Sequence, residues 1–362
     1  MPELSSITRR AKHVLQAMRE RPMVVLDIGG TTIRVARLDP LTGEHERVRR
    51  APTPNYLTHA GMPPERIVEL LARSIEREVT AELDGERADC IIVGYPGPVS
   101  GHGVAVRSPT ILGPDSTHRV EVAAMFSVLW PDATVRVLND LSCAGYSFVH
   151  AGHRNFCVLT VGSGIGNKIF LDGRPYVGEH GFGGEIGHVK VSPGHATPLA
   201  DLRADLGDIA SGRGTVWLAK LWAQRRPEDF RDSALADLRA DSADQVWSEQ
   251  LVAAFRCSDK LARAIVAGAA QPLAAALAHL HLGCGLERFF ITGGFASALG
   301  EQYRRMLVRL LRQCTWELGQ DWDSLVVLSE AQREHGLLGA CYLASLVRDA
   351  QPRWPRSRPL KV

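Results

Sequence analysis

The clearest hydrophobic pattern in the chain is a short apolar run that ends at a pair of glycines. Met23–Asp27 reads MVVLD, and Thr32–Leu38 (TIRVARL) continues as a second strand-like segment after the glycines. Two strands joined by a tight turn predict a β-hairpin. A dinucleotide-binding Rossmann domain would place a helix after these glycines, so the pattern argues against that fold.

The rest of the first half alternates between helical and strand-like patterns. Apolar positions recur at helical spacing in residues 65–83, and Arg119–Trp130 also looks helical. Cys90–Gly94 and Thr134–Leu138 are apolar runs of strand length. Helices that alternate with buried strands predict an α/β fold.

A second copy of the opening pattern begins at Phe156–Val161. The glycine turn GSGIG and the strand NKIFLDG follow it, about 130 residues after the first turn, so the sequence predicts a duplicated lobe. Residues 215–283 are then rich in helical patterns, Phe289–Ile291 and Ser324–Leu328 are short strands, and Gly336–Val347 reads as a closing helix.

These patterns predict an α/β protein with two lobes, because 362 residues suit two hydrophobic cores better than one. Residues 23–141 form the predicted N-terminal lobe, together with a closing helix at 336–349. Residues 142–335 form the predicted C-terminal lobe. A helical extension (1–22) precedes the lobes, and a tail rich in Pro and Arg (350–362) follows them.

Composition and charge narrow the class of protein. There are 42 Lys and Arg residues against 40 Asp and Glu, so the basic excess typical of a nucleic-acid-binding protein is missing. No apolar run reaches membrane-spanning length, and the N-terminus lacks the apolar core of a signal peptide. The seven cysteines never form a CxxC motif, which indicates buried free thiols. We therefore expect a cytoplasmic protein without a nucleic-acid or membrane partner.

Glycine turns at three strand ends are candidate nucleotide-binding elements. In DIGGTTIR the backbone N–H groups can approach a phosphate, the threonine hydroxyls add donors, and Asp27 is placed to hold Mg²⁺. VGSGIG repeats this context, and the glycines of FFITGGF could admit a base or ribose. Each turn alone could be a plain tight turn, but the three together favour a nucleotide site. The candidates are Gly29, Gly30, Thr31 and Thr32 in the first turn, Gly162, Ser163, Gly164 and Gly166 in the second, and Gly293 and Gly294 in the third.

Two further segments carry polar side chains suited to a hydroxyl-bearing substrate. Asp140 follows a strand and could act as general base, with Asn139 beside it as a ring-hydroxyl contact, although the pair could instead cap the following helix. In HGFGGEIGHVKV, Glu185 and His188 could reach substrate hydroxyls. They could also bind a metal, but a structural zinc needs about four ligands, and the next forty residues contain only His195 and no cysteine.

In this order, the motifs resemble those of the ROK family (repressors, open reading frames and sugar kinases), part of the hexokinase and actin superfamily. The resemblance runs from about Val24 to Ala344 and includes DIGGT, GYPGPV, Asn-Asp, GSGIG, GGEIGH, ASGRG, TGG and GLLGA. It implies two actin-like (ribonuclease H-like) lobes with an ATP and substrate cleft between them. It also implies an ATP- and Mg²⁺-dependent kinase of sugar hydroxyls.

The resemblance assigns roles to individual residues. Asp140 corresponds to the catalytic base of the family, and Asn139, Glu185, His188 and Gly97 of GYPGPV correspond to substrate contacts. The first two glycine turns correspond to its phosphate motifs, and the TGG pair corresponds to its adenosine motif.

One departure from the family pattern bears on the substrate. ROK proteins usually carry a cysteine-rich zinc loop where this chain reads VSPGHATPLADLRADLGDIASG, so no zinc is expected. The glutamate that ends that loop, a sugar contact in glucokinases, has only Gly207 or Asp208 near its place. Altered sugar loops occur in kinases of C7-cyclitols. The acceptor is therefore expected to be a glucose-type hexose or a C7-cyclitol such as a valiolone.

Two other functions compete with this interpretation. A sugar-responsive ROK regulator carries a winged helix-turn-helix before the DxGGT strand, and only 22 residues precede that strand here. A non-catalytic sugar-binding protein would not need Asp27 and Asp140. The resemblance leaves a homodimer open.

Overall fold

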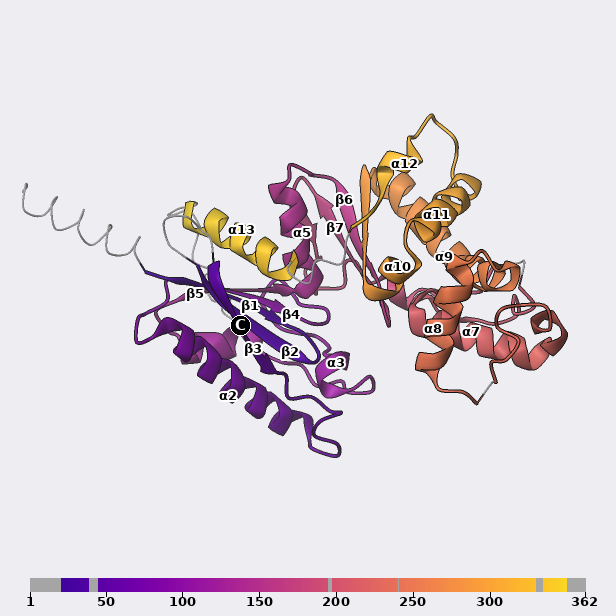
Figure 1. Cartoon of the computed structure of the whole chain (residues 1–362). Coiled ribbons are helices and arrows are strands. Elements are labelled where there is room, and N and C mark those ends of the chain that lie inside the picture. The colour runs from indigo at the N-terminus through magenta and orange to yellow at the C-terminus, as the bar shows by residue number, and fades with distance from the viewer. Residues whose placement is uncertain (1–20, 39–44, 195–196, 240, 330–334, 350–362) are drawn as a thin grey trace, which may run out of the picture. The chain divides into compact units, whose positions relative to one another are not determined.

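The computed structural model describes residues 21–38, 45–194, 197–239, 241–329 and 335–349 (Figure 1). The predicted helical extension falls almost entirely outside these residues, and the tail from residue 350 lies wholly outside them. The chain forms two compact units. The N-terminal unit contains Met1–Gly152, Val177–Phe182 and Glu334–Val362, and the C-terminal unit contains His153–Tyr176 and Gly183–Arg333.

The N-terminal unit is built on a five-stranded mixed sheet with the order β3-β2-β1-β4-β5. The first two glycine-linked strands pair antiparallel as predicted, and β4 and β5 add parallel to β1 on its other side. The parallel strands β1, β4 and β5 therefore end at one edge of the sheet. The bounds are β1 Met23–Ile28, β2 Thr32–Leu38, β3 His45–Pro52, β4 Cys90–Tyr95 and β5 Thr134–Asn139.

Helices cover both faces of this sheet. Val24 belongs to a buried cluster that includes Ile67 and Leu71 of α2 (Pro64–Leu83), whereas the next residue, Val25, belongs to a second cluster with α13 (His335–Asp349). Because side chains alternate between the faces of a strand, α2 and α13 lie on opposite faces of the sheet (Figure 1). The remaining helices are α3 Pro109–Leu112, α4 Val122–Leu129 and α5 Asp140–His150, and α5 packs on α13.

The C-terminal unit repeats the arrangement of strands. Its sheet has the order β12-β11-β6-β7-β8, in which β6 pairs antiparallel with β7 and parallel with β11. The predicted duplication of strand, glycine turn and strand is thus confirmed, as is the α/β fold class. The bounds are β6 Phe156–Val161, β7 Ile165–Leu171, β8 Arg174–Tyr176, β11 Arg288–Thr292 and β12 Val326–Leu328.

The helices of the C-terminal unit are concentrated after β8. They are α6 Leu206–Ala210, α7 Gly212–Arg225, α8 Asp244–Arg256, α9 Lys260–Cys284, α10 Gly294–Leu299, α11 Glu301–Cys314 and α12 Trp322–Leu325. A small two-stranded sheet pairs β9 (Lys190–Val191) with β10 (Ala204–Asp205). Within the described residues, α9 is the one helix long and apolar enough to cross a membrane, but 67% of its apolar window is buried, with Leu273 and Leu277 in the core of the unit.

The strand predicted at 167–173 lies two residues too late, since β7 runs from Ile165 to Leu171. Two further predicted boundaries are wrong because local polar bonds override the apolar pattern. The helix predicted from Arg119 begins at Val122, since Val120 pairs with Ala105 as a β-bridge. The strand predicted from Ser324 begins at Val326, since Ser324 still belongs to α12, where its N–H donates to the side chain of Asp321. The expectation of buried cysteines is also wrong for three of the seven, because Cys257, Cys284 and Cys314 are exposed free thiols.

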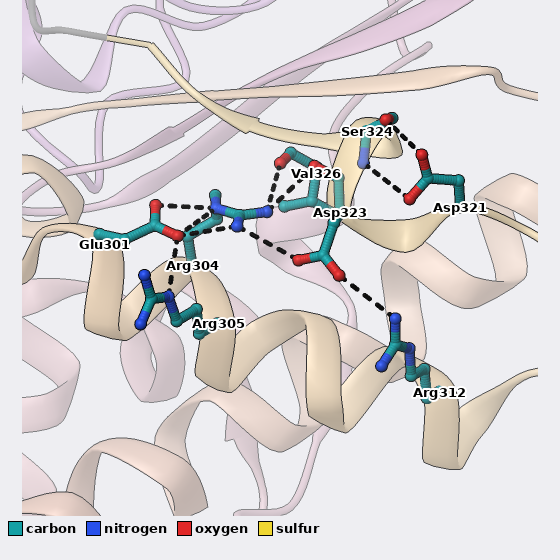
Figure 2. Close-up of polar contacts among 8 residues, drawn as sticks. All are labelled: Glu301, Arg304, Arg305, Arg312, Asp321, Asp323, Ser324 and Val326. Carbon is teal, nitrogen blue, oxygen red and sulfur yellow. Dashed lines mark hydrogen bonds and ion pairs between the residues drawn. The ribbon is translucent and has the colours of Figure 1, made fainter.

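A polar network holds α12 and β12 against α11 (Figure 2). The side chain of Arg304 is only 15% exposed and pairs with the carboxylates of Glu301 and Asp323. It also donates to the backbone carbonyls of Asp323 (3.1 Å) and Val326 (3.3 Å). A shielded cation with several acceptors fixes the packing of these elements.

Candidate active site

The first glycine turn joins β1 to β2 and is fixed by two residues that follow β3. The N–H of Gly29 donates to the carbonyl of Thr32 across the turn (2.9 Å). Thr53 Oγ1 donates to the carbonyl of Gly29 and Asn55 Nδ2 to that of Gly30, each at 2.8 Å. Because the protein's own donors occupy these carbonyls, the turn is held in one conformation, as suits a turn that presents amides to an anion.

Packing and exposure differ along this turn. A side chain at Gly30 would place its Cβ 2.9 Å from the Cβ of Thr110, so close packing requires glycine there. Thr31 is exposed and Thr32 is half-buried. The two hydroxyls thus lie on the part of the turn that solvent reaches.

The predicted metal ligand, Asp27, is already half of an ion pair. Its Oδ2 accepts a hydrogen bond from Arg34 of β2 at 2.8 Å, and its side chain is only 14% exposed. Burial raises the pKa of the Asp27 carboxyl, and the charge and hydrogen bond of Arg34 oppose that rise. A Cβ on Gly336, in the first turn of α13, would lie 3.0 Å from Oδ1. The Asp27 carboxylate therefore lies between β2 and α13 and packs closely against both.

Asn139 caps α5, so the capping interpretation holds for this residue. Its Oδ1 accepts from the N–H groups of Leu141 (3.0 Å) and Ser142 (3.3 Å), and its Nδ2 donates to the carbonyl of Gly97 (2.9 Å). Gly97 has a φ of +100°, and a side chain there would collide with the carbonyl of Arg107. Both predicted substrate contacts thus have demonstrable structural roles.

Asp140, the predicted base, is the first residue of α5 and is half-buried. Its Oδ1 accepts from the N–H of Leu141 at 2.8 Å. Burial raises the pKa of the Cys143 thiol, and the charges of Asp27 and Asp140 raise it further. The two carboxylates lie within electrostatic reach of one thiol because β1 and β5 end on either side of β4. The structure therefore brings together the predicted base and the predicted metal ligand.

A cavity of about 390 Å³ lies within the C-terminal unit. Gly162 and Ser163 of the second glycine turn line it, together with Gly212 at the start of α7 and Gly294 at the start of α10. The N–H of Gly212 donates to the carbonyl of Gly162 (2.8 Å) and joins two of these segments directly. Three glycine motifs that are far apart in the sequence thus meet at one cavity.

The walls of this cavity combine apolar and polar groups. Val216 and Phe295 provide largely buried apolar surface, and Asp244 and Ser248 provide polar groups. Such a lining suits a ligand with a flat apolar part and several hydroxyls. Of the described residues predicted for this site, Gly164, Gly166 and Gly293 do not line the cavity. Gly293 instead has a φ of +102° and passes so close to the Val161 carbonyl that only glycine fits.

Glu185 of the GGEIGH segment is held by a buried lysine. Its Oε1 accepts from Lys168 Nζ at 2.5 Å, and the lysine side chain is only 2% exposed. Lys168 lies on β7, directly after the second glycine turn. The GGEIGH segment and that turn are therefore adjoining parts of one unit.

His188 has a different environment from Glu185. Its side chain is 76% exposed, and its Nδ1 lies 3.4 Å from Oδ2 of Asp205 on β10. Lys190 pairs with the other oxygen of Asp205 at 2.6 Å and lowers the pKa of that carboxyl, with a smaller contribution from His188. The imidazole is thus accessible while one ring nitrogen faces a carboxylate.

Comparison with known proteins places the chain in a family. The family model described as the ROK family matches residues 23–346. The chain belongs to the ROK family. It is 32% identical to the C(7)-cyclitol 7-kinase of Streptomyces hygroscopicus subsp. limoneus, over 89% of this chain and 93% of that protein. It is 26% identical to the glucokinase of Streptomyces coelicolor, over 90% and 98% of the two chains.

A solved ROK structure has the same fold. The ROK hexokinase from Thermus thermophilus superposes with a TM-score of 0.65 at 29% identity, over 91% of this chain and 99% of that one. The fold is thus the actin-like α/β fold of these kinases. This ROK protein is a phosphotransferase with an alcohol group as acceptor.

Sequence reasoning missed three residues that shape the site of this ROK protein: Thr53, Asn55 and Lys168. A lysine inside the apolar strand NKIFL does signal a buried cation that needs partners. Its carboxylate partner lies 17 residues further on, and only the fold brings the two together. Thr53 and Asn55 follow a strand with no pattern that marks them.

The segment between β9 and β10, where the family usually carries its zinc loop, is held by other contacts in this ROK protein. Leu199 is fully buried, the N–H of Gly194 donates to the carbonyl of Gly268 on α9 (2.8 Å), and Thr197 packs against the same glycine. His195 lies outside the described residues. Among those that are described, no group of three or more His, Cys, Asp or Glu residues could hold a metal ion.

Proposed function

We propose that this ROK protein transfers the γ-phosphoryl group of ATP to a hydroxyl of a C7-cyclitol. The cavity of the C-terminal unit carries the proposal, because Gly162, Gly212 and Gly294 meet there in a space suited to the adenosine part of a nucleotide. The relative at 32% identity is named as a kinase of such a cyclitol, whereas the glucokinase is 26% identical. A glucose-type hexose is the competing acceptor.

The glycine turns would bind the phosphates of ATP. Thr53 and Asn55 hold the first turn through its carbonyls, and the N–H of Gly29 bonds within the turn, so the hydroxyls of Thr31 and Thr32 are its proposed donors to phosphate oxygens. Ser163 of the second turn is exposed beside the cavity and can donate to a phosphate. Donors fixed in place before the reaction stabilise developing negative charge without reorganisation.

Asp140 is the proposed general base. It would accept the proton of the acceptor hydroxyl as that oxygen forms a bond to the γ-phosphorus and the bond to ADP breaks. The N–H of Leu141 and the capped start of α5 keep its carboxylate oriented.

Asp27 fits the role of a single Mg²⁺ ligand. Mg²⁺ in kinases is commonly held by one or two carboxylates together with substrate phosphates. The Asp27 carboxyl is poorly solvated, as its raised pKa indicates, and a cation would relieve that cost. Bound there, the ion would neutralise phosphate charge, with Arg34 keeping the carboxylate in place.

The acceptor would be held mainly by Glu185 and His188. Glu185 can accept hydrogen bonds from hydroxyls, and the exposed imidazole of His188 can donate or accept one. For Asn139 we propose a supporting role instead of the predicted main contact, because its oxygen caps α5 and its amide bonds to Gly97. That arrangement fixes the start of the helix that carries Asp140.

A panel of acceptors tests the substrate. Initial rates of ADP release would be measured with ATP and Mg²⁺ against valiolone-type cyclitols, glucose, mannose and N-acetylmannosamine. We expect kcat/KM to be highest for a cyclitol. Efficient turnover of glucose with the cyclitols inert would overturn the cyclitol assignment, and release of ADP only when an acceptor is present would exclude a non-catalytic sugar-binding protein.

A further inference from the structure

The C-terminal unit buries a lysine ammonium group beside the acceptor-binding loop. Lys168 Nζ donates to the carbonyls of Gly183 (2.9 Å) and Gly184 (3.3 Å) and to Glu185 Oε1 (2.5 Å). Burial of an ammonium group is costly unless its donors are satisfied, and here all three have an acceptor. The three acceptors belong to consecutive residues of a single loop, so the lysine holds that loop in one conformation.

The loop backbone lies directly on the strand that carries the lysine. Gly184 has a φ of +74°, and a Cβ there would lie 2.8 Å from the carbonyl oxygen of Asn167. The neighbouring side chain of Asn167 accepts from the N–H of Ile186 at 3.0 Å. Side chains of two successive β7 residues thus hold the loop on either side of Glu185.

The lysine also determines how Glu185 meets solvent. The pairing with Lys168 occupies Oε1 of Glu185, while 29% of the Glu185 side chain remains exposed. A carboxylate fixed in this way presents its other oxygen in a narrow range of directions. An ionised carboxylate only accepts hydrogen bonds, so it selects a ligand group that donates one.

We propose that Lys168 is a positioning residue that sets the acceptor specificity of this ROK protein. It holds the Gly183 and Gly184 carbonyls and one Glu185 oxygen, so that the second oxygen receives a hydroxyl of the acceptor ring. A ring with a ketone or no oxygen at that position is rejected, because the carboxylate is then left without a donor. This inference rests on the proposed function of Glu185.

The test replaces the lysine and a matched control in the same unit. Lys168→Met removes the charge and keeps most of the volume. Arg304→Met removes a cation that also bonds carboxylates and two backbone carbonyls, but at α11, α12 and β12 (Figure 2). Glu185→Gln and the double variant Lys168→Met/Glu185→Gln complete a double-mutant cycle, which measures the coupling between the two side chains. The KM and kcat for the acceptor and the KM for ATP would be measured for each, with thermal unfolding as a check of folding.

We expect Lys168→Met to lower kcat/KM for the acceptor by roughly 10- to 100-fold, because a small displacement of a positioning group has effects of that size. The KM for ATP should stay within about twofold. The kcat/KM of the double variant should be little lower than that of Glu185→Gln alone, because both substitutions disrupt the same contact between Lys168 and Glu185. Arg304→Met should lower stability without changing the acceptor KM.

Three results would overturn the inference. The first is an unchanged acceptor kcat/KM in Lys168→Met, and the second is a double variant whose loss in kcat/KM equals the product of the two single losses. The third is a loss in acceptor kcat/KM in Arg304→Met as large as that in Lys168→Met. If Lys168→Met does not fold, Lys168→Arg replaces it, because a planar guanidinium keeps the charge but cannot reproduce the three bonds. A folded Lys168→Arg with a wild-type acceptor KM would also refute the positioning role. Wild-type protein that phosphorylates no sugar or cyclitol refutes the proposed function instead.

Discussion

At the scale of single residues, two neighbours at one helix start have different tasks. Asn139 uses its oxygen to cap α5 and its amide to hold Gly97, whereas Asp140 remains half-buried with one oxygen on the N–H of Leu141. The cap and the proposed base are therefore not alternatives for the pair. The first residue fixes the helix start that orients the second.

Replacement of Asn139 should affect stability first. In Asn139→Ala the N–H of Ser142 loses its side-chain acceptor, the N–H of Leu141 keeps only that of Asp140, and the Gly97 carbonyl loses its donor. We expect the free energy of unfolding to fall by about 1–2 kcal/mol, the usual cost of a lost cap. Urea denaturation measures this. Asn139→Ser, which can still cap the helix, should lose less, and an unchanged unfolding free energy in Asn139→Ala would contradict the assignment.

The residue scale also shows what sequence can and cannot reveal. The residue types at Asp140 and Glu185 suggested a site, because carboxylates near glycine turns suit a ligand rich in hydroxyls; their catalytic and binding roles stay predictions. The sequence did not predict that Thr53 and Asn55 hydrogen-bond to the first turn, or that Lys168 pairs with Glu185. Those bonds join residues separated by 17 to 25 positions, and only the folded sheet brings them together.

At the scale of elements, the apolar patterns predicted the core strands and long helices well. β1, β4 and β6 are largely buried runs, and β2 mixes buried with half-buried residues, so their periodicity or length leaves little choice of structure. The failures came at element ends and at β3 (His45–Pro52) and α11 (Glu301–Cys314), which were not predicted. Val120 looked helical but pairs with Ala105, because backbone bonding partners from elsewhere in the fold decide where an element begins.

The contact between α13 and α5 should depend on pH. His335 of α13 stacks on Phe148 and bonds to Ser147 Oγ at 3.0 Å, and burial lowers its pKa below the ordinary value. The unfolded chain, with a histidine pKa of about 6.5, then binds protons more readily than the folded protein. Stability is therefore full above about pH 6.5 and falls as the pH drops from there toward the lower folded-state pKa.

Denaturation at several pH values checks this prediction. His335→Gln cannot titrate but can still bond to Ser147, so its stability should fall less between pH 6.5 and 5 than that of the wild type. Part of the slope should remain, because burial and Arg288 also lower the pKa of His153 in the C-terminal unit. A variant with the full wild-type slope would show that His335 is not responsible.

At the scale of the whole molecule, duplication explains why the fold was predictable. Each unit builds a five-stranded sheet on a glycine-linked hairpin, so one recognised pattern specifies both. GSGIG and TGGF were predicted to belong to one nucleotide site, and both line the cavity, whereas no sequence pattern placed Gly212 of ASGRG beside them. We propose that the GGEIGH loop and its buried lysine determine which hydroxyl-bearing ring is the acceptor.

The most direct test of phosphoryl transfer follows the products with wild-type protein and Asp140→Asn. Phosphorus NMR of a reaction with ATP, Mg²⁺ and the preferred acceptor should show one new phosphate monoester per ADP formed. In Asp140→Asn the rate should fall roughly 10²- to 10⁴-fold, the usual contribution of a general base, while ATP binding is retained. An unchanged rate in Asp140→Asn, or ADP and inorganic phosphate with no monoester from the wild type, would contradict this account.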